Sequence, residues 1–350
     1  PRFWPDPGPE FKLSATKRIV IAGVSTRWGS ELARTLQRRP GVGEIIGIDS
    51  APPTSDLGRT EFVEADIRNP VISRILPSLE PDVVVHCGIV WYPEKGRPSR
   101  ALHDINVIGT LQLLAACEKT SGLQALIARG SAAIYGSAPG APAFFTEDMA
   151  RRLPLVTRFQ RDIGELEGYF DNFARRRPEI TCCMLRFGVE VGPGLDTPFN
   201  RYLNLPVVPT RMGFDPRLQL LHVDDATGAL AAATLNPVRG AVNVAPDGAI
   251  SLSRLLRLCG KSAVGVPPVL VGVINRRIGN YLGSADLYRD GELLLRYGRG
   301  CDNRRLREEV GFELAFDSEG TARDFARTSQ GIQALFPSPH PGSPVRSVSR

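Results

Sequence analysis

Short apolar runs rich in β-branched residues alternate along this chain with longer segments in which apolar residues recur every three or four positions. The first pattern is typical of buried strands and the second of amphipathic helices, and their alternation is typical of a parallel sheet covered by helices. The predicted strands are Arg18–Ala22, Glu44–Asp49, Glu61–Ala65, Asp82–Cys87, Ala125–Arg129 and Thr181–Phe187. The predicted helices between them are Ser30–Arg38, Ala101–Lys119 and Arg158–Arg176. The sequence therefore predicts an α/β fold built on a doubly wound parallel sheet.

The alternation breaks in two segments of the C-terminal half. Residues 192–216 are interrupted by Pro and Gly, and Ser251–Arg299, within the second segment 246–335, shows no clear succession of strands and helices. We expect these segments to form a smaller C-terminal substrate-binding lobe. Residues 17–191, together with the returning segment 217–245, would then form the sheet domain.

The composition is that of an ordinary globular protein, with 350 residues, 42% of them hydrophobic and 23% charged. The net charge of +6 comes from arginines spread along the chain, which favours no nucleic-acid partner. No apolar run reaches the length of a membrane span and the N-terminus lacks signal-peptide features, so we expect a cytoplasmic protein with no membrane contact. Residues 1–16 and 336–350, rich in Pro, Ser, Gly and Arg, are predicted to be disordered tails.

Six cysteines are scattered along the chain, with no CxxC pair and no histidines at metal-ligand spacing. This arrangement predicts buried free thiols and no metal site.

A glycine-containing loop, residues 23–29, joins the first predicted strand to the first predicted helix. Gly23 permits a tight turn, Gly29 allows close packing of strand and helix, and the helix N-terminus would face a pyrophosphate. Asp49 ends the second predicted strand, where a carboxylate can hold the adenine ribose, and Asp66 follows the third. The sequence therefore predicts a Rossmann dinucleotide-binding domain.

The choice of dinucleotide depends on two residues with opposite preferences. Asp49 favours the free 2′-hydroxyl of NAD, whereas Arg27, inside the loop, could balance the 2′-phosphate of NADP. Arg27 could equally be a solvated loop residue. We favour NADP(H), with NAD(H) as the alternative.

Further strings in the chain resemble those of the extended short-chain dehydrogenase/reductase family, the NAD-dependent epimerases and dehydratases. They are Asn106-Val107-Ile108-Gly109-Thr110, Ser131-Ala132-Ala133-Ile134-Tyr135-Gly136, Arg186 with Gly192-Pro193-Gly194, His222-Val223-Asp224-Asp225, and Asn243-Val244. They occur in the family's order, from about Arg18 to Arg327. The resemblance implies the same fold, a bound nicotinamide dinucleotide, and a monomer or homodimer.

The resemblance adds residues to the predicted cofactor site. Pro193 would lie beside the carboxamide end of the nicotinamide, and Asn106 would support helix packing or a bound water. The predicted cofactor-binding residues are Gly23, Ser25, Thr26, Arg27, Trp28, Gly29, Asp49, Asp66, Ile67, Cys87, Gly88, Asn106 and Pro193.

The resemblance also identifies a departure in the chemistry. Ser131, four residues before Tyr135, matches the family's catalytic serine, and Glu167 matches a glutamate four residues after its catalytic lysine. Counting back from Glu167 places Ile163 at the lysine and Phe159 at the tyrosine of the usual acid pair. No lysine occurs between Lys119 and Lys261, so a register slip does not restore the pair. The usual proton donor, which typically contributes about 10²–10⁴-fold to the rate, is therefore missing.

An aromatic substrate could replace this donor if a phenolic hydroxyl beside its carbonyl supplied an internal hydrogen bond. The combination of an extended scaffold with Phe and Ile at these positions resembles atypical angucyclinone ketoreductases, which implies NAD(P)H-dependent reduction of a polycyclic aromatic polyketide in antibiotic biosynthesis. The predicted substrate-pocket residues are Phe159, Ile163, Tyr92, Tyr135, Tyr202, Met212 and Phe214.

Three alternatives remain open at this point. The chain could be a catalytically silent cofactor sensor or scaffold. It could be a nucleotide-sugar epimerase or dehydratase, with Arg211 and Arg217 at a diphosphate, although no base is in place. It could also use a relocated acid, for which His86, Tyr92 and Tyr135 are the candidates.

Overall fold

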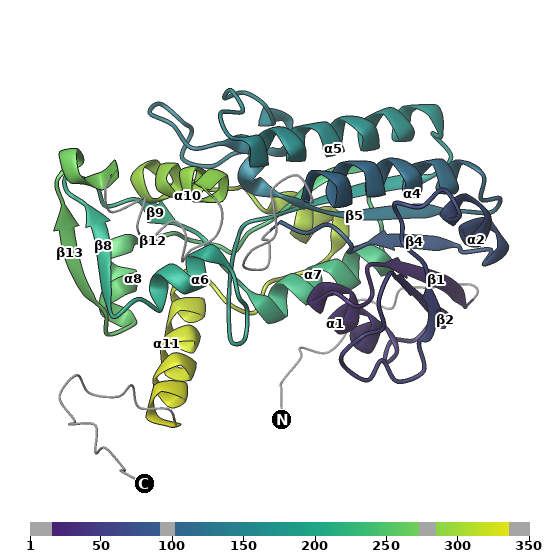
Figure 1. The fold of residues 1–350 in the computed structure, drawn as a ribbon, viewed down its shortest axis with the longest axis horizontal. Helices are drawn as coiled ribbons and strands as arrows, with labels where there is room; N and C mark the ends of the chain where they lie inside the picture. Colours follow the sequence, from purple (N-terminus) through teal and green to yellow (C-terminus); the bar gives the residue numbers. More distant parts are fainter. Residues whose placement is uncertain (1–15, 92–101, 273–284, 336–350) are drawn as a thin grey trace, which may run out of the picture.

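The computed structural model describes residues 16–91, 102–272 and 285–335, and all structural statements below refer to these residues. A seven-stranded sheet with strand order β11-β6-β5-β4-β1-β2-β3 forms its centre, and every neighbouring pair is parallel (Figure 1). Its strands are β1 (Lys17–Ala22), β2 (Val42–Asp49), β3 (Glu61–Glu64), β4 (Val83–His86), β5 (Ala125–Ser131), β6 (Thr181–Phe187) and β11 (Gly240–Val244). The predicted Rossmann fold, a doubly wound parallel sheet, is confirmed.

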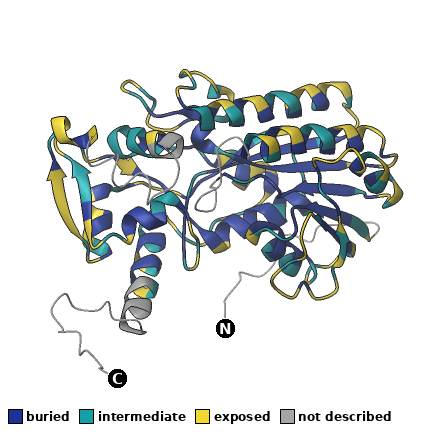
Figure 2. Ribbon diagram, viewed as in Figure 1, coloured by how far each residue is buried: buried dark blue, intermediate teal, exposed yellow. Residues whose placement is uncertain are grey.

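Helices cover both faces of this sheet (Figure 1). One apolar core packs α2 (Ile72–Ser78), α4 (Gly109–Glu118) and α5 (Arg158–Arg176) against one face, and a second packs α1 (Arg27–Leu36) and α7 (Val223–Leu235) against the other. The central strands are buried along their length, as Figure 2 shows. Burial on both faces explains why these strands have nearly continuous apolar sequences.

Apart from β6, the strands differ from their predicted bounds by one or two residues at an end, and two predicted helices need larger corrections. Helix α1 begins at Arg27 and not at Ser30, because the Thr26 side chain accepts a hydrogen bond from the Gly29 N–H and caps the helix there. The predicted helix Ala101–Lys119 contains a π-helical segment, η1 (Asp104–Ile108), before α4. By contrast, α5 has the predicted bounds, because Thr157 and Gln160 form a capping box at its start.

The remaining elements form a third apolar core at the other end of the molecule, which we call the lobe (Figure 1). Two small sheets lie there, one pairing β8 with β13 in parallel and the other pairing β9 with β12 antiparallel. The lobe elements are α6 (Pro198–Leu203), β8 (Val207–Arg211), β9 (Arg217–Leu218), β12 (Ile250–Ser251), α8 (Leu252–Leu258), β13 (Ser262–Val266), α10 (Ala285–Tyr297) and α11 (Ser318–Leu335). The remaining short elements are η2 (Ala132–Tyr135), η3 (Glu147–Met149), β7 (Val189–Val191), β10 (Leu220–His222) and η4 (Leu306–Val310).

Two further properties follow from the described residues. All six cysteines are buried and free, as the sequence predicts. None of the helices in the described ranges combines the length and the apolar character needed to cross a membrane.

Candidate functional site

The loop between β1 and α1 has the backbone that a dinucleotide site requires. Gly23 adopts a φ of 85°, and a Cβ at this position would collide with the backbone of Gly88, at the end of the neighbouring strand β4. A Cβ at Gly29 would collide with the carbonyl of Gly23. Thr26 closes the turn, because its hydroxyl donates to the Gly23 carbonyl at 2.6 Å and caps α1. Glycine at both positions therefore keeps side chains away from the start of α1, and a helix N-terminus without obstructing side chains suits a pyrophosphate.

Replacing Gly23 by alanine is expected to weaken NADH binding at least tenfold, because the added methyl group must displace Gly88 as well as occupy a left-handed backbone region. Gly122→Ala is the matched control, since Gly122 has a φ of 79° and a Cβ added there would have no neighbour within 4 Å. Fluorescence titration with NADH measures both variants. Equal affinities would show that the close approach at Gly23 has no part in cofactor binding.

The two predicted carboxylates lie at or just after the ends of the strands β2 and β3, and Asp49 contacts the glycine loop. Asp49, at the end of β2, accepts hydrogen bonds from the N–H groups of Ser25 at 3.0 Å and Ser50 at 2.8 Å. Burial raises the pKa of Asp49, and these two hydrogen bonds oppose the rise. Asp66 forms an ion pair with Arg68 at 2.6 Å, which holds the pKa of Asp66 below its usual value. Both groups can accept hydrogen bonds from a ribose or an adenine.

The Arg27 guanidinium is already engaged in hydrogen bonds within the protein. It donates to the carbonyls of Gly194 at 2.8 Å and Pro193 at 3.1 Å, so it joins the glycine loop to the turn after β7. This places Pro193 beside the cofactor loop. The sequence favoured NADP(H) because Arg27 could balance the 2′-phosphate. With Arg27 bound to these two carbonyls, that argument no longer holds.

Other predicted cofactor residues have mainly structural contacts. The buried ring of Trp28 lies 4.4 Å from the Arg129 guanidinium and 6.3 Å from the ring of Phe187. Asn106 holds the chain after β4 by exchanging two hydrogen bonds with the backbone of Val90. Cys87 and Ile67 are buried, and Ile67 packs between Gly88 and Gly109.

A cavity of about 90 Å³ opens between the carboxyl end of the sheet and the lobe. Its lining is mostly apolar and comes from both parts of the molecule. The lining residues are Ser131, Ala132, Ala133, Phe159, Phe187, Gly188, Val189, Pro198, Phe199, Tyr202, Gln219, Asp290, Gly291, Leu294, Leu295, Arg299 and Cys301. The predicted residues Ser131, Phe159 and Tyr202 therefore meet in one cavity.

The residue at the position of the missing acid, Phe159, forms part of the cavity wall. Phe159 lines the cavity and packs edge-to-face on Trp91, with ring centroids 5.7 Å apart. Ile163, one turn along α5, has no exposed surface and packs in the core beneath the wall. Ser131 accepts a hydrogen bond from the Ala133 N–H at 3.2 Å, and its own proton has no acceptor among the described residues. At the positions of the usual acid pair the described wall thus offers no ionisable group, and the Ser131 hydroxyl is the donor beside them.

Several predicted pocket residues lie elsewhere. Ile163 and Tyr135 are completely buried and are not among the lining residues, which corrects their prediction as pocket wall. Met212, at the end of the lobe strand β8, is 53% exposed, and Phe214 packs edge-to-face on Tyr297 instead of facing the cavity. Tyr92 lies outside the described residues.

Tyr135 belongs to a buried polar network that links η2 with α5, β6 and β11. Its hydroxyl donates to Asn243 at 2.6 Å and accepts from Arg186 at 2.9 Å. Arg186 also forms a bidentate ion pair with Glu167, at 2.9 and 2.8 Å. Burial raises the pKa of Tyr135 well above its usual range, so this residue is unsuited to act as a relocated acid.

His86 is equally unsuited to donate a proton. It is buried, its Nε2 contacts the Thr110 hydroxyl at 2.9 Å, and burial lowers its pKa to about 4. A neutral imidazole is therefore expected at physiological pH.

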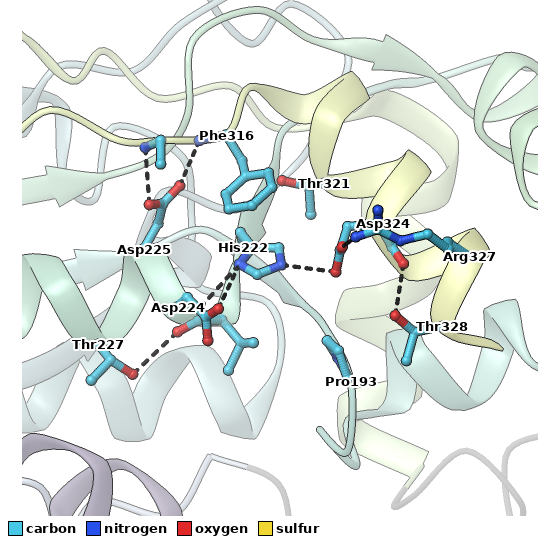
Figure 3. A network of polar contacts seen from close by, with 12 residues as sticks. Pro193, His222, Asp224, Asp225, Thr227, Phe316, Thr321, Asp324, Arg327 and Thr328 are labelled. Atoms are coloured by element: carbon cyan, nitrogen blue, oxygen red, sulfur yellow. Dashed lines mark hydrogen bonds and ion pairs between the residues drawn. The ribbon is translucent and has the colours of Figure 1, made fainter. Parts of the chain in front are cut away.

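The His222-Asp225 segment joins the sheet domain to the lobe (Figure 3). His222 caps α7, stacks on Phe316 with ring centroids 4.0 Å apart, and contacts Asp324 of α11 at 3.2 Å. Asp225 accepts hydrogen bonds from the N–H groups of Ala315 and Phe316, both at 2.9 Å. These contacts give the segment a structural role, since they fix the chain that leads into α11.

One group of side chains outside the cavity has the geometry of metal ligands. Ligand atoms of His103, Asp162 and Glu165 lie within 4.8 Å of one another, and the His103 and Asp162 side chains contact each other at 3.1 Å. Ligand spacing in the sequence does not indicate this group, because His103 precedes η1, whereas Asp162 and Glu165 lie on α5.

Sequence reasoning also missed the polar part of the cavity. Asp290 and Arg299 lie in the lobe segment without a recognisable motif, and they form an ion pair at 2.9 Å on the cavity wall. No local sequence signal could have identified them.

Comparison with known proteins agrees with this geometry. The model of the NAD dependent epimerase/dehydratase family matches residues 19–245. An uncharacterised protein of Mycobacterium tuberculosis is 37% identical over 330 residues, which cover 93% of this chain and 86% of that protein. A 3-diazoavenalumate denitrifying reductase from a Streptomyces species is 26% identical over 322 residues, covering 88% of this chain and all of the relative. The crystal structure of a UDP-glucose-4-epimerase from Stenotrophomonas maltophila, with bound NAD and a formylated UDP-arabinopyranose, has a TM-score of 0.67 at 18% identity and covers 91% of this chain and 99% of that one.

Proposed function

We propose that this chain, which belongs to the NAD dependent epimerase/dehydratase family, is an NAD(P)H-dependent reductase of aromatic substrates that supply their own activation. The observation that carries the proposal is the replacement of the acid pair within an otherwise intact site. Phe159 lines the same cavity as Ser131, and Ile163 is completely buried in the core. We favour as substrate a ketone of a polycyclic aromatic polyketide of the angucyclinone type.

The chemistry that a bound nicotinamide would supply is a hydride for the carbonyl carbon. Two residues of the chain act on the carbonyl group that accepts the hydride. Ser131 can donate its hydroxyl proton in a hydrogen bond to the carbonyl oxygen, and Phe159 excludes water from that side of the cavity. A phenol beside the carbonyl strengthens its internal hydrogen bond in such an apolar setting. The carbonyl oxygen then takes the phenolic proton, and solvent reprotonates the phenolate.

The Streptomyces relative supports a reductase within this family. Its name describes the reduction of a diazo compound, which is also a substrate other than a nucleotide sugar. That relative covers nearly the same length as this chain, although at only 26% identity.

A nucleotide-sugar substrate fits the described lining less well. Oxidation of a sugar hydroxyl needs a base, and neither Phe159 nor Ile163 can provide one. Arg299 is the one arginine among the described lining residues, and Asp290 neutralises it. Arg211 forms an ion pair with Glu292 and Arg217 is exposed on β9, so the residues suggested for a diphosphate do not line this cavity.

The cofactor that we now favour is NAD(H). Asp49 would repel a 2′-phosphate, and Arg27 is held by the carbonyls of Pro193 and Gly194. Comparison of the kcat/KM values with NADH and NADPH tests this choice, and a clear preference for NADPH would overturn it.

The proposed function is tested with peri-hydroxytetralone, whose hydroxyl bonds to its own carbonyl, and with the methyl ether of that ketone. We expect the hydroxyketone to be reduced with a kcat/KM about 10²-fold or more above that of the ether, the amount that general acid catalysis typically contributes. NADH oxidation and formation of the secondary alcohol are the measurements.

The other outcomes separate the alternatives. Equal turnover of both ketones would mean that the protein supplies an acid, which contradicts the proposal. Tight NADH binding without turnover of either ketone would favour the silent sensor.

A further inference from the structure

Asp290 stands out among the cavity residues because it is a carboxylate on a largely apolar wall. It lies on α10, is 7% exposed, and faces the same cavity as Ser131 and Phe159. Its Oδ1 atom accepts hydrogen bonds from Gln160 Nε2 at 2.6 Å and from Arg299 Nη2 at 2.9 Å. As a carboxylate, Asp290 accepts hydrogen bonds and donates none.

Both partners of Asp290 are themselves fixed by the backbone. Gln160 belongs to the capping box of α5, and its Oε1 accepts the Val156 N–H at 2.9 Å. Arg299 donates through Nε to the carbonyl of Gly136 at 2.8 Å. Two side chains from separate segments therefore hold the carboxylate in one orientation, in the cavity that Phe159 also lines.

The second oxygen of this carboxylate has no such partner. Oδ2 receives no hydrogen bond from the described residues, and the cavity that Asp290 lines is largely apolar, with Leu294, Leu295 and Phe199 also in its lining. A carboxylate oxygen in an apolar cavity is unfavourable unless a donor reaches it. A substrate that fills the cavity and displaces water must therefore bring that donor itself.

We infer that Asp290 accepts a hydrogen bond from a hydroxyl or amino group of the substrate, and so selects aromatic substrates that carry this donor away from the reacting carbonyl. The inference rests on the proposed function for the aromatic class of ligand. Asp290 thus acts as a specificity-determining residue, and it transfers no proton in the reaction. A flat ligand would contact Phe159 and Ser131 with its ketone and Asp290 with its remote hydroxyl.

Two anthraquinones provide a matched probe. Emodin and chrysophanol share the hydroxyls that neighbour a carbonyl, and chrysophanol lacks only the hydroxyl that lies away from both carbonyls. Their binding to the full chain, in the presence of cofactor, is measured by calorimetry. We expect the wild type to bind emodin about ten- to a hundredfold more tightly, the range for one hydrogen bond to a charged group.

Asp290→Asn is expected to abolish this preference, because its amide oxygen still serves Gln160 and Arg299 while its NH₂ group faces the ligand. Glu292→Gln is the matched control, since Glu292 lies on the same helix, pairs with Arg211 and is absent from the cavity lining. It should leave the preference unchanged. NADH affinity and thermal stability confirm that each variant is folded.

Equal affinity of the wild type for both anthraquinones, including the absence of binding, would overturn the inference, as would a preference that persists in Asp290→Asn. The comparison within wild type holds even if the variant does not fold. Binding and turnover also separate the two proposals: a preference for emodin without reduction of any ketone contradicts the proposed function alone. Reduction of hydroxyketones without this preference contradicts the inference alone.

Discussion

Restoring a lysine at position 163 is expected to lower the free energy of unfolding by about 4 kcal/mol, because an ammonium group would enter a position where the isoleucine has no exposed surface. A buried lysine typically has its pKa lowered by about three units or more, and each unit corresponds to about 1.4 kcal/mol. Chemical denaturation of wild type and Ile163→Lys measures the loss. Phe159→Tyr is the matched control, since its hydroxyl would extend into the cavity at little expected cost.

The pH dependence of Ile163→Lys provides a second check. The lysine would be largely neutral in the folded state and charged in the unfolded state, so unfolding takes up a proton. The unfolded state then binds more protons, and the stability of the variant rises with pH up to the unfolded pKa of about 10.4. The difference from wild type should be largest at neutral pH and should shrink as the pH approaches that value. A variant as stable as wild type at neutral pH would mean that a side chain at position 163 can reach water in the folded state.

Removal of the Glu167 carboxylate is expected to have an effect of similar size. Glu167→Ala leaves the buried guanidinium of Arg186 without its bidentate partner, and breaking such a pair typically lowers stability by about 3–5 kcal/mol. Tyr135 and the Glu147 carbonyl would remain as hydrogen-bond acceptors for Arg186, but neither carries a compensating charge. Thermal or chemical denaturation measures the change.

The exposed ion pair between Arg305 and Glu309 is the control for this prediction. Glu309→Ala should lower stability by less than about 1 kcal/mol, because solvent screens the charges. Similar losses in Glu167→Ala and Glu309→Ala would show that the buried network does not stabilise the fold as described.

The elements of the sheet domain are predictable because local patterns determine them. The bounds of α5 follow from the Thr157 cap and from an apolar stripe that includes Ile163, Leu166 and Phe170. The glycine loop is predictable because Gly23 and Gly29 must be glycine for a backbone reason that is visible in the sequence. The predicted start of α1 at Ser30 is wrong because Thr26, a typical N-cap residue, lies inside the glycine loop and caps the helix there.

Most of the cavity could not be predicted, because its residues meet only through long-range packing. Gln160 and Asp290 are 130 positions apart, and their contact requires α10 to pack on α5. Tyr135 is predicted at the pocket wall, but the 3₁₀ turn that contains it buries the ring on Phe145, with centroids 4.8 Å apart. Arg27 lies in the predicted loop, yet its partners Pro193 and Gly194 are 166 and 167 positions away.

The most direct test of the central claim is a tracer measurement with peri-hydroxytetralone and NADH deuterated at the transferable position. We predict that the carbinol carbon of the product carries deuterium, and that Phe159→Tyr changes the rate by no more than a few-fold. An unlabelled ketone recovered from an enzyme that binds NADH would contradict hydride transfer. An increase of about 10²-fold in Phe159→Tyr would contradict substrate activation, because it would show that an acid supplied by the protein still limits the reaction.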